Sequence, residues 1–552
     1  MKKERVNDRK EWAGRYALLK GNMSFLSVTF IAFCTILIFL YYIVPKRMQK
    51  YVLLAGNYIF YMWTNYIYIF FILFTTLNTF FFARELGRLN QRQRNLKESK
   101  KNDQTASVKA RIEKVIKTKR KVMYSAIFLN FGILVILKYG ADAVGIYDSI
   151  AKAAGFDRIG EVSVIIPLGI SFYTFQTMSY ILDVYRNKYQ PEKSLFEFAL
   201  FVSFFPQLVQ GPISRYEQLM PQLKEEHRFF FKNISYGLQL MLWGFFKKLV
   251  IADRISVMSE AVFNGYDYYK GSYVIFIAVF YSLQVYADFS AGMDIAGGVA
   301  ECLGIRLTDN FRRPFFADNL TEYWRRWHIS LNDWLRDYVF YPLTVSKSFI
   351  KMGKFFRKIF GNTFGKYFAV YIATFIVRII NAIWHGGSPK YFLNGFYNGL
   401  IIIIGMQCRP LSQKLKAFFH VKQESVGWKL FGILRTFMLI SMGRIIVKAE
   451  NIRIAYKMIQ SVFTTFNPWI WFDGSLFLLG VPQREFYILI FALIILLLVS
   501  LLQEKGICVR DKIQGQGLVA RWGIYYAAIL LVLLCGVYGI GYDASGFIYM
   551  QF

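Results

Sequence analysis

The first candidates for chemistry are histidines in apolar surroundings, where an ionisable side chain is costly. His385 follows Trp384 at the end of an apolar run, in NAIWHGGSP, and precedes two glycines that let another backbone or a substrate approach closely. Such a histidine can serve as a general base or a proton relay. The alternative is a hydrogen-bonded core histidine at a helix C-terminus, where a cation is favoured. The chain has two further histidines in charged stretches, His227 and His420, which we expect to be solvated loop residues.

The fourth histidine, His328, belongs to the segment NLTEYWRRWHISLNDWLRDYVFYPL at positions 319–343. Its opening Asn-Leu-Thr-Glu predicts a helix N-terminus. Trp324, His328 and Asn332 recur every four residues, which predicts one shared helix face. The alternative is an amphipathic helix at the membrane interface, although a tryptophan belt needs no histidine. Three arginines could bind the phosphates of a ligand or simply pair with the three acids interleaved among them: Arg325, Arg326 and Arg336, with Glu322, Asp333 and Asp337.

Other chemistry-bearing patterns are missing from the sequence. It has no phosphate-binding glycine loop, no dinucleotide fingerprint, no serine-nucleophile elbow and no zinc-protease motif. The five cysteines are far apart and show no zinc spacing, so we expect small core residues and neither a disulfide framework nor a metal site.

The elements that position these residues must be membrane helices. Apolar residues make up 55% of the 552 residues, and the net charge is +32, which in so apolar a chain indicates basic cytoplasmic loops rather than nucleic-acid binding. Several apolar runs are shorter than a full span, and the run 196–211 contains Pro206, which predicts a broken helix. We therefore predict an all-α polytopic protein with about 11 transmembrane helices plus re-entrant and interfacial pieces. The runs are 25–44, 51–63, 66–83, 122–139, 164–182, 196–211, 234–251, 273–289, 367–384, 392–408, 431–442, 486–502 and 523–540.

Two basic segments set the predicted topology. Arg84–Lys121 carries 14 Lys and Arg against four acids, and Thr344–Lys366 carries six and no acid. Both should be cytoplasmic. Met1–Met23 reads as a basic polar extension and residues 24–552 as a single membrane domain, because no repeat or low-complexity tract divides them.

Several motifs, in order along the chain, resemble the membrane-bound O-acyltransferases (MBOAT), most closely the branch of the alginate O-acetyltransferase membrane subunit. The resemblance extends from about residue 25 to the end. The motifs are IPLGISFYTFQTMSYILDVYR (166–186), FFPQLVQGPISRY (204–216), GFFKKLVIAD (244–253), YSLQVYADFSAGMDIAGG (281–298), NFRRPFF (310–316), WRRWHISLNDWLRDYVFYPL (324–343), IWHGG (383–387), KAEN (448–451) and FIYMQF (547–552).

This resemblance implies a ring of tilted helices around a central tunnel. In the family the histidine of W-H-G is catalytic, which corresponds to His385, and that of W-R-R-W-H is a second active-site residue, which corresponds to His328. The acidic positions of D-F-S-x-x-x-D correspond to Asp288 and Asp294. The other candidates for lining the tunnel or binding substrate are Trp384, Trp324, Arg325, Arg336, Asp337 and Asn332.

The chain departs from the family pattern in three places. Asp294 follows Ser-Ala-Gly-Met rather than a Gly-Tyr-Ser sequence, and Tyr397-Asn398-Gly399 replaces a frequent Y-H-G. Arg378 and Asn381 stand before Trp384 where small apolar residues are usual.

The implied function is transfer of a short acyl group, acetyl as the first expectation, to a hydroxyl of an extracytoplasmic cell-envelope polysaccharide. The donor would be a cytoplasmic thioester, acetyl-CoA or carrier-linked, with no permanently bound cofactor. Partners would be the bilayer, this donor, and the polysaccharide or an accessory extracytoplasmic acyltransferase, in the plasma membrane of a bacterium and without nucleic acid. We expect His385 to act as general base and His328 to serve the donor. Two alternatives are D-alanyl transfer to teichoic acid from a carrier-protein thioester, and a proton-coupled transporter that uses His385 as a relay.

Overall fold

The computed structural model describes residues 23–102, 106–154, 156–157, 159–160, 166–362, 365–538 and 546–547. The predicted extension Met1–Met23 lies outside this range except for Met23. The described residues form helices and no strand, apart from one isolated antiparallel bridge between Phe311 and Trp327. The predicted all-α class is therefore confirmed. The chain divides into two compact units, one of residues 1–241, 295–307 and 540–550 and the other of 242–294, 308–539 and 551–552.

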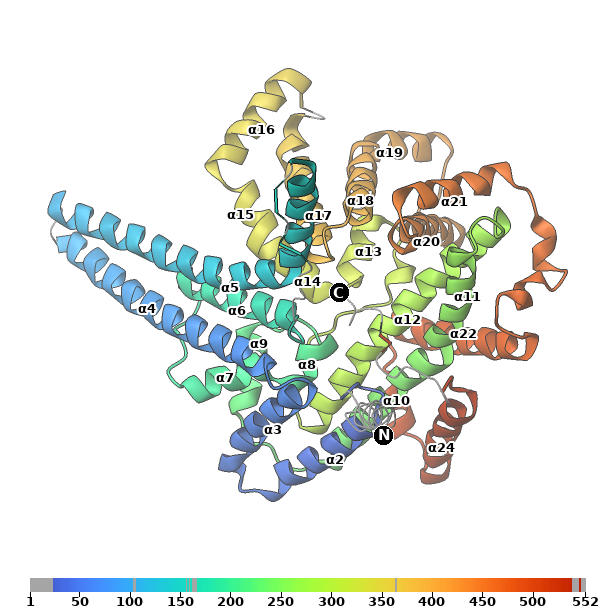
Figure 1. The fold of residues 1–552 in the computed structure, drawn as a ribbon, viewed down its shortest axis with the longest axis horizontal. Helices are drawn as coiled ribbons and strands as arrows, with labels where there is room; N and C mark the ends of the chain where they lie inside the picture. The colour runs from blue at the N-terminus through green and yellow to red at the C-terminus, as the bar shows by residue number, and fades with distance from the viewer. Residues whose placement is uncertain are drawn as a thin grey trace. The chain divides into compact units, whose positions relative to one another are not determined.

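The first unit contains a long antiparallel pair of helices. α4 (Tyr68–Asn102) and α5 (Ala106–Ala154) run side by side, and α6 (Ile170–Tyr185) packs against both (Figure 1). The basic segment 84–121 was expected to be a loop, but most of it continues these two helices. The remaining helices of the unit are α2 (Val28–Ile43), α3 (Gln49–Thr64), α7 (Leu195–Ser203), α8 (Phe205–Gln210), α9 (Tyr216–Lys224) and the start of α10 (Phe231–Phe245).

Two predictions meet different outcomes in the first unit. The run 196–211 is broken, as expected, between α7 and α8, where Phe204 leaves the helical conformation and Pro206 opens the next helix. His227 is not a solvated loop residue, because its Nδ1 lies 2.9 Å from the Tyr41 hydroxyl and its carbonyl accepts a hydrogen bond from Gln49. The interpretation of His227 from its charged neighbours was wrong because residues far away in the chain cover it.

The second unit contains both remaining candidate histidines. Its centre is α12 (Ser272–Cys302), which is mostly buried and whose last turns count with the first unit. α17 (Phe368–Trp384) and α18 (Pro389–Gln407) pack against each other, and α13 (Leu320–Arg326) contacts α18 (Figure 1). The other helices are α11 (Asp253–Asn264), α14 (Ile329–Leu335), α15 (Tyr341–Thr344), α16 (Lys347–Phe360), α19 (Arg409–Phe418), α20 (Val426–Lys448), α21 (Ile452–Thr464), α22 (Gln483–Glu504), α23 (Val509–Gln514) and α24 (Leu518–Cys535), with π-helices at Phe246–Ala252 and Arg336–Phe340.

Among the described residues, seven helices are long and apolar enough to cross a bilayer. α2 is a shorter apolar helix. The expectation of about 11 spans stays a prediction. The cysteine expectation is confirmed for Cys34 and Cys302, which are buried, and wrong for Cys408 and Cys508, which are exposed. The candidate spans are Tyr68–Lys100, Ala106–Ala154, Ser272–Cys302, Gly365–Trp384, Val426–Lys448, Gln483–Glu504 and Leu518–Cys535.

Candidate active site

His328 stands at a break between two short helices. Asn319 caps α13, as predicted, by accepting a hydrogen bond from the Glu322 backbone, but the helix ends at Arg326. His328 itself is in the left-handed region, with φ of 46°. A non-glycine residue held there is strained, and such strain concentrates at functional sites. The shared helix face expected for Trp324, His328 and Asn332 therefore does not exist.

A distant segment explains why the helix breaks. The Asn310 carbonyl accepts a hydrogen bond from the Ile329 backbone, and the Asn310 side chain accepts one from the Ser330 backbone. Asn332 donates to the carbonyls of Trp327 and His328, at 2.7 and 3.2 Å. These bonds take the place of the i to i−4 ladder that would have continued α13. Asn332 thus supports the backbone turn that presents His328.

The Asn310 side chain also fixes the protonation pattern of His328. The side-chain oxygen of Asn310 already accepts two hydrogen bonds, from the backbone amide and from the hydroxyl of Ser330, both at 2.9 Å. His328 Nδ1 lies 3.2 Å from the Asn310 amide nitrogen and 3.3 Å from the Asn310 side-chain oxygen. Because that oxygen already accepts two hydrogen bonds from Ser330, we assign the amide as the donor and Nδ1 as the acceptor. The neutral imidazole then carries its proton on Nε2. His328 is only 3% exposed and lies outside the seven candidate spans, and its burial lowers its pKa well below the usual value.

Trp384 brings the two candidate histidines together. Its ring centroid lies 5.7 Å from that of His328 and 4.5 Å from that of His385. His328 also meets the Phe289 ring edge-on at 4.9 Å. The two histidines are 57 positions apart in the sequence, yet they share one aromatic neighbour. The sequence predicted both residues and the structure supplies their common contact.

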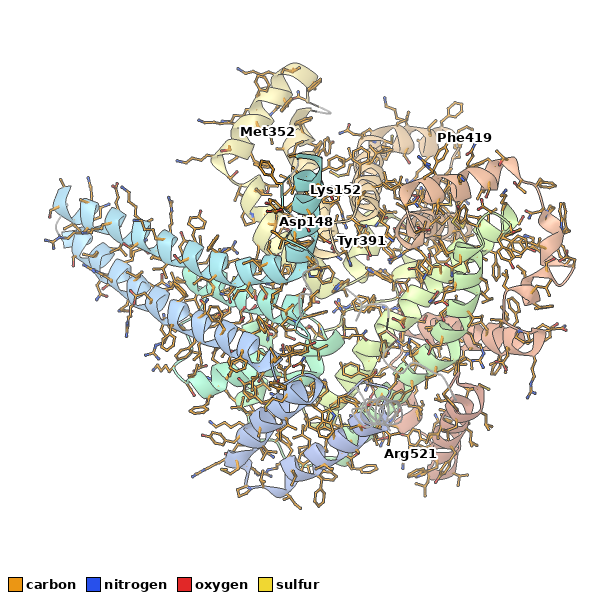
Figure 2. The ribbon with its side chains drawn as sticks, in the orientation of Figure 1. Asp148, Lys152, Met352, Tyr391, Phe419 and Arg521 are labelled. Atoms are coloured by element: carbon orange, nitrogen blue, oxygen red, sulfur yellow. The ribbon has the colours of Figure 1, made fainter. Side chains whose placement is uncertain are left out.

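His385 occupies the end of α17 and is half-buried. The chain turns there through Gly386 and Gly387, whose φ values of 118° and 67° favour glycine. Their backbone amides close the helix by donating to the carbonyls of Ile383 and Ala382. The Tyr391 ring, on the first turn of α18 and labelled in Figure 2, stacks on His385 at 5.7 Å. This arrangement leaves part of the imidazole accessible.

The two acidic candidates are held by lysines that sequence reasoning missed. Asp288 and Asp253 both pair with Lys248 at 2.8 Å, and Asp294 pairs with Lys247 at 2.7 Å. Lys247 also donates to Ser290 at 2.6 Å. These bonds fix α12 on both sides of Phe289, which contacts His328. Two adjacent lysines inside the apolar run GFFKKLVIAD were the signal that could have revealed this support.

The arginines on the His328 segment pair with acids. Arg325 is 3.6 Å from Glu322, and Arg326 bonds Glu322 and Glu504, each at 2.9 Å. Arg336, whose side chain is 46% exposed, pairs with Asp333 at 2.6 Å and with Asp337 at 3.1 Å. Their positive charges are therefore compensated within the protein. This favours the expectation that these arginines pair with acids over the expectation that they bind phosphates.

Trp324 has a different cationic neighbour. The guanidinium carbon of Arg378, on α17, lies 4.3 Å from its ring centroid. Arg378 is only 8% exposed. A buried cation stacked on an indole thus lies beside the segment that leads to His328.

Comparison with known proteins decides the family. The model of the MBOAT, membrane-bound O-acyltransferase family matches residues 188–445. The probable alginate O-acetylase AlgI of Pseudomonas putida is 30% identical over 454 residues, which cover 81% of this chain and 81% of that protein. The chain belongs to the membrane-bound O-acyltransferase family. It is a multi-pass membrane acyltransferase.

Other relatives in this family modify different polymers. A peptidoglycan O-acetyltransferase of Helicobacter pylori is 28% identical, and the matched region covers 62% of this chain and 65% of that protein. A teichoic acid D-alanyltransferase of Bacillus subtilis is 26% identical, covering 50% of this chain and 67% of its own length. The MBOAT match contains both histidines and both acidic candidates.

Proposed function

We propose that this MBOAT enzyme transfers a short acyl group, acetyl first among them, from a cytoplasmic thioester to a hydroxyl of an extracytoplasmic cell-envelope polysaccharide. The observation that carries the proposal is the pair of histidines on Trp384, one strained and buried, the other half-buried at a helix end. One imidazole can then act on each of the two reactants.

The proposed step uses His385 as the base. The acceptor oxygen attacks the thioester carbonyl carbon while His385 takes the hydroxyl proton. The tetrahedral intermediate collapses by breaking the C–S bond, and the His385 imidazolium returns the proton to the departing thiolate. General base catalysis of this kind contributes about 10²–10⁴-fold to a rate.

His328 supplies the opposite chemistry. Its Nδ1 accepts from Asn310, so Nε2–H is a hydrogen-bond donor, and its lowered pKa keeps the ring neutral. A fixed neutral donor can polarise the thioester carbonyl and stabilise the oxyanion that forms on attack. Phe289, held by the ion pairs on both sides of it, keeps the ring in place.

The wider architecture of the proposal follows the family resemblance. About 11 spans would surround a tunnel within a single membrane domain, with the segments 84–121 and 344–366 cytoplasmic. The enzyme would work in the cytoplasmic membrane of a bacterium, together with its polysaccharide or an accessory extracytoplasmic acyltransferase. The relatives named for polymer acylation support an envelope acceptor.

The experiment that tests the proposal compares envelope polymers from cells that carry the wild-type protein, His385→Ala or no protein. Mild base releases ester-linked acyl groups, which mass spectrometry then identifies. We expect acetyl esters only with the wild-type protein and with the control His420→Ala, whose side chain is exposed. Ester-linked D-alanine in place of acetyl would instead support the alternative, D-alanyl transfer from a carrier-protein thioester. Equal ester content in all cells would contradict the proposal.

A further inference from the structure

Arg378 is a buried positive charge that no described carboxylate neutralises. In the part of the chain that the structure describes, no carboxylate forms an ion pair with it, and its buried Nε has no hydrogen-bond partner. Three acids of the His328 segment, Glu322, Asp333 and Asp337, pair with other arginines. A buried guanidinium without a counter-ion is costly and calls for an anion.

A second orphan donor lies beside it. The indole nitrogen of Trp324 is buried and, among the described residues, has no hydrogen-bond acceptor. Because the Trp324 ring stacks on the Arg378 guanidinium at 4.3 Å, both donors belong to one small region. Two adjacent buried donors that lack acceptors are suited to an oxyanion, which a guanidinium binds through charge-assisted hydrogen bonds.

The position of this pair relates it to both histidines. Arg378 and His385 are seven residues apart on or at the end of α17, so they share a helix face about 10 Å apart along the axis. Trp324 precedes His328 by four residues. Arg378 lies on the side of His385 that is nearer the basic segment 344–366, which is predicted to be cytoplasmic. An anion bound there would approach from the side on which the donor enters.

We propose that Arg378 and Trp324 bind the phosphate of a phosphopantetheine arm that carries the acyl group as a thioester. The inference rests on the proposed function, because it assumes a thioester donor. About a dozen bonds separate the sulfur of such an arm from its phosphate, which at about 1.2 Å of advance per bond is roughly 15 Å when extended. The spacing of about 10 Å along α17 plus the reach of an arginine side chain, which tilts toward the helix N-terminus, matches that length.

The test measures binding of two probes to the full-length protein purified in detergent. One probe is acetyl-phosphopantetheine with the thioester sulfur and carbonyl separated by a methylene, so that it cannot be cleaved, and the other is the same molecule without its phosphate. The wild-type protein should bind the phosphorylated probe about 10- to 100-fold more tightly, the range of one charged hydrogen-bonded contact. In Arg378→Gln this preference should fall to within about threefold, through weaker binding of the phosphorylated probe alone.

Three further variants sharpen the measurement. Trp324→Phe keeps the ring and removes the indole N–H, so it should reduce the preference about three- to tenfold. Arg378→Lys keeps the charge without the planar fork and should give an intermediate preference. The matched control is Arg435→Gln, because Arg435 also stacks on an aromatic ring, Phe431, but is exposed and donates to a backbone carbonyl. It should keep the wild-type preference.

The outcomes separate this inference from the proposed function. If the wild-type protein binds both probes equally well, or if Arg378→Gln keeps the preference, the phosphate site is wrong while the thioester donor stands. Equal binding together with a raised KM for the polysaccharide in Arg378→Gln would assign the arginine to an acceptor carboxylate instead. If neither probe binds the wild-type protein, the donor class of the proposed function is itself contradicted. Should Arg378→Gln fail to fold, Trp324→Phe decides the question.

Discussion

The surroundings of His328 and His385 differ although both contact Trp384. His328 is buried, strained at a helix break and hydrogen-bonded to Asn310. His385 is half-buried at a helix end, and two glycines follow it. A hydrogen-bond donor that must meet a carbonyl oxygen in a fixed position gains from rigidity. A base must reach its substrate and change protonation in each cycle, so it gains from access. This contrast favours the proposed division, in which His328 acts on the thioester carbonyl and His385 on the acceptor hydroxyl.

The largest expected effect is the loss of the base. His385→Ala should lower the transfer rate about 10²–10⁴-fold, because no other group would take the hydroxyl proton. The melting temperature should stay near that of wild type, since the side chain is only half-buried. Rates are measured as thiol released from the donor in the presence of acceptor. Retention of more than about a tenth of the activity would remove His385 from this role.

Glutamine substitutions should separate the two histidines next. His328→Ala should slow transfer about 10²–10³-fold, the usual effect of losing one oxyanion donor. His328→Gln should recover part of that loss because its amide N–H can still donate. At position 385 glutamine should recover nothing relative to alanine, because an amide cannot accept the proton. The same recovery at both positions would break the contrast.

The smallest effect concerns stability against pH. Burial lowers the pKa of folded His328, whereas in the unfolded chain the pKa of a histidine is about 6.5. As the pH falls through that value, the unfolded state binds a proton that the folded state does not, so the stability from this residue is present above about pH 6.5 and lost below it. The loss is at most about 1.4 kcal/mol per pH unit.

Melting temperatures at pH 7.5 and pH 5.5 check this. The melting temperature of the wild-type protein should fall more on acidification than that of His328→Gln, which has no titratable group at this position. His420→Ala, at an exposed histidine, should behave like wild type. An equal loss in wild type and His328→Gln would mean that His328 takes up a proton while folded.

Local signals in the sequence predicted much of the fold. Apolar runs predicted the helices, Pro206 the break between α7 and α8, and the Asn-Leu-Thr-Glu cluster the cap at Asn319. These features depend on residues a few positions apart, so periodicity and capping rules apply to them. The resemblance of W-R-R-W-H and W-H-G to the family's motifs predicted both candidate histidines.

Long-range contacts could not be predicted in this way. The break at His328 comes from Asn310, 18 positions earlier, which competes for the amides of the helix. Arg326 pairs with Glu504, 178 positions away, so spacing alone could not tell a phosphate-binding arginine from a neutralised one. The same limit applies to Arg378: the sequence showed its unusual position, but not that, among the described residues, no carboxylate pairs with it and that it stacks on Trp324.

The most direct test of the division between the two histidines is donor binding by His328→Ala and His385→Ala. The purified proteins are titrated with the uncleavable acetyl-phosphopantetheine analogue, and transfer rates are measured on the same preparations with a cleavable donor. We expect His385→Ala to bind the analogue with near wild-type affinity and to transfer nothing measurable. His328→Ala should bind it about tenfold or more weakly, because its hydrogen bond to the carbonyl is gone. Wild-type affinity in His328→Ala, with only the transfer rate reduced, would contradict the assignment of His328 to the donor.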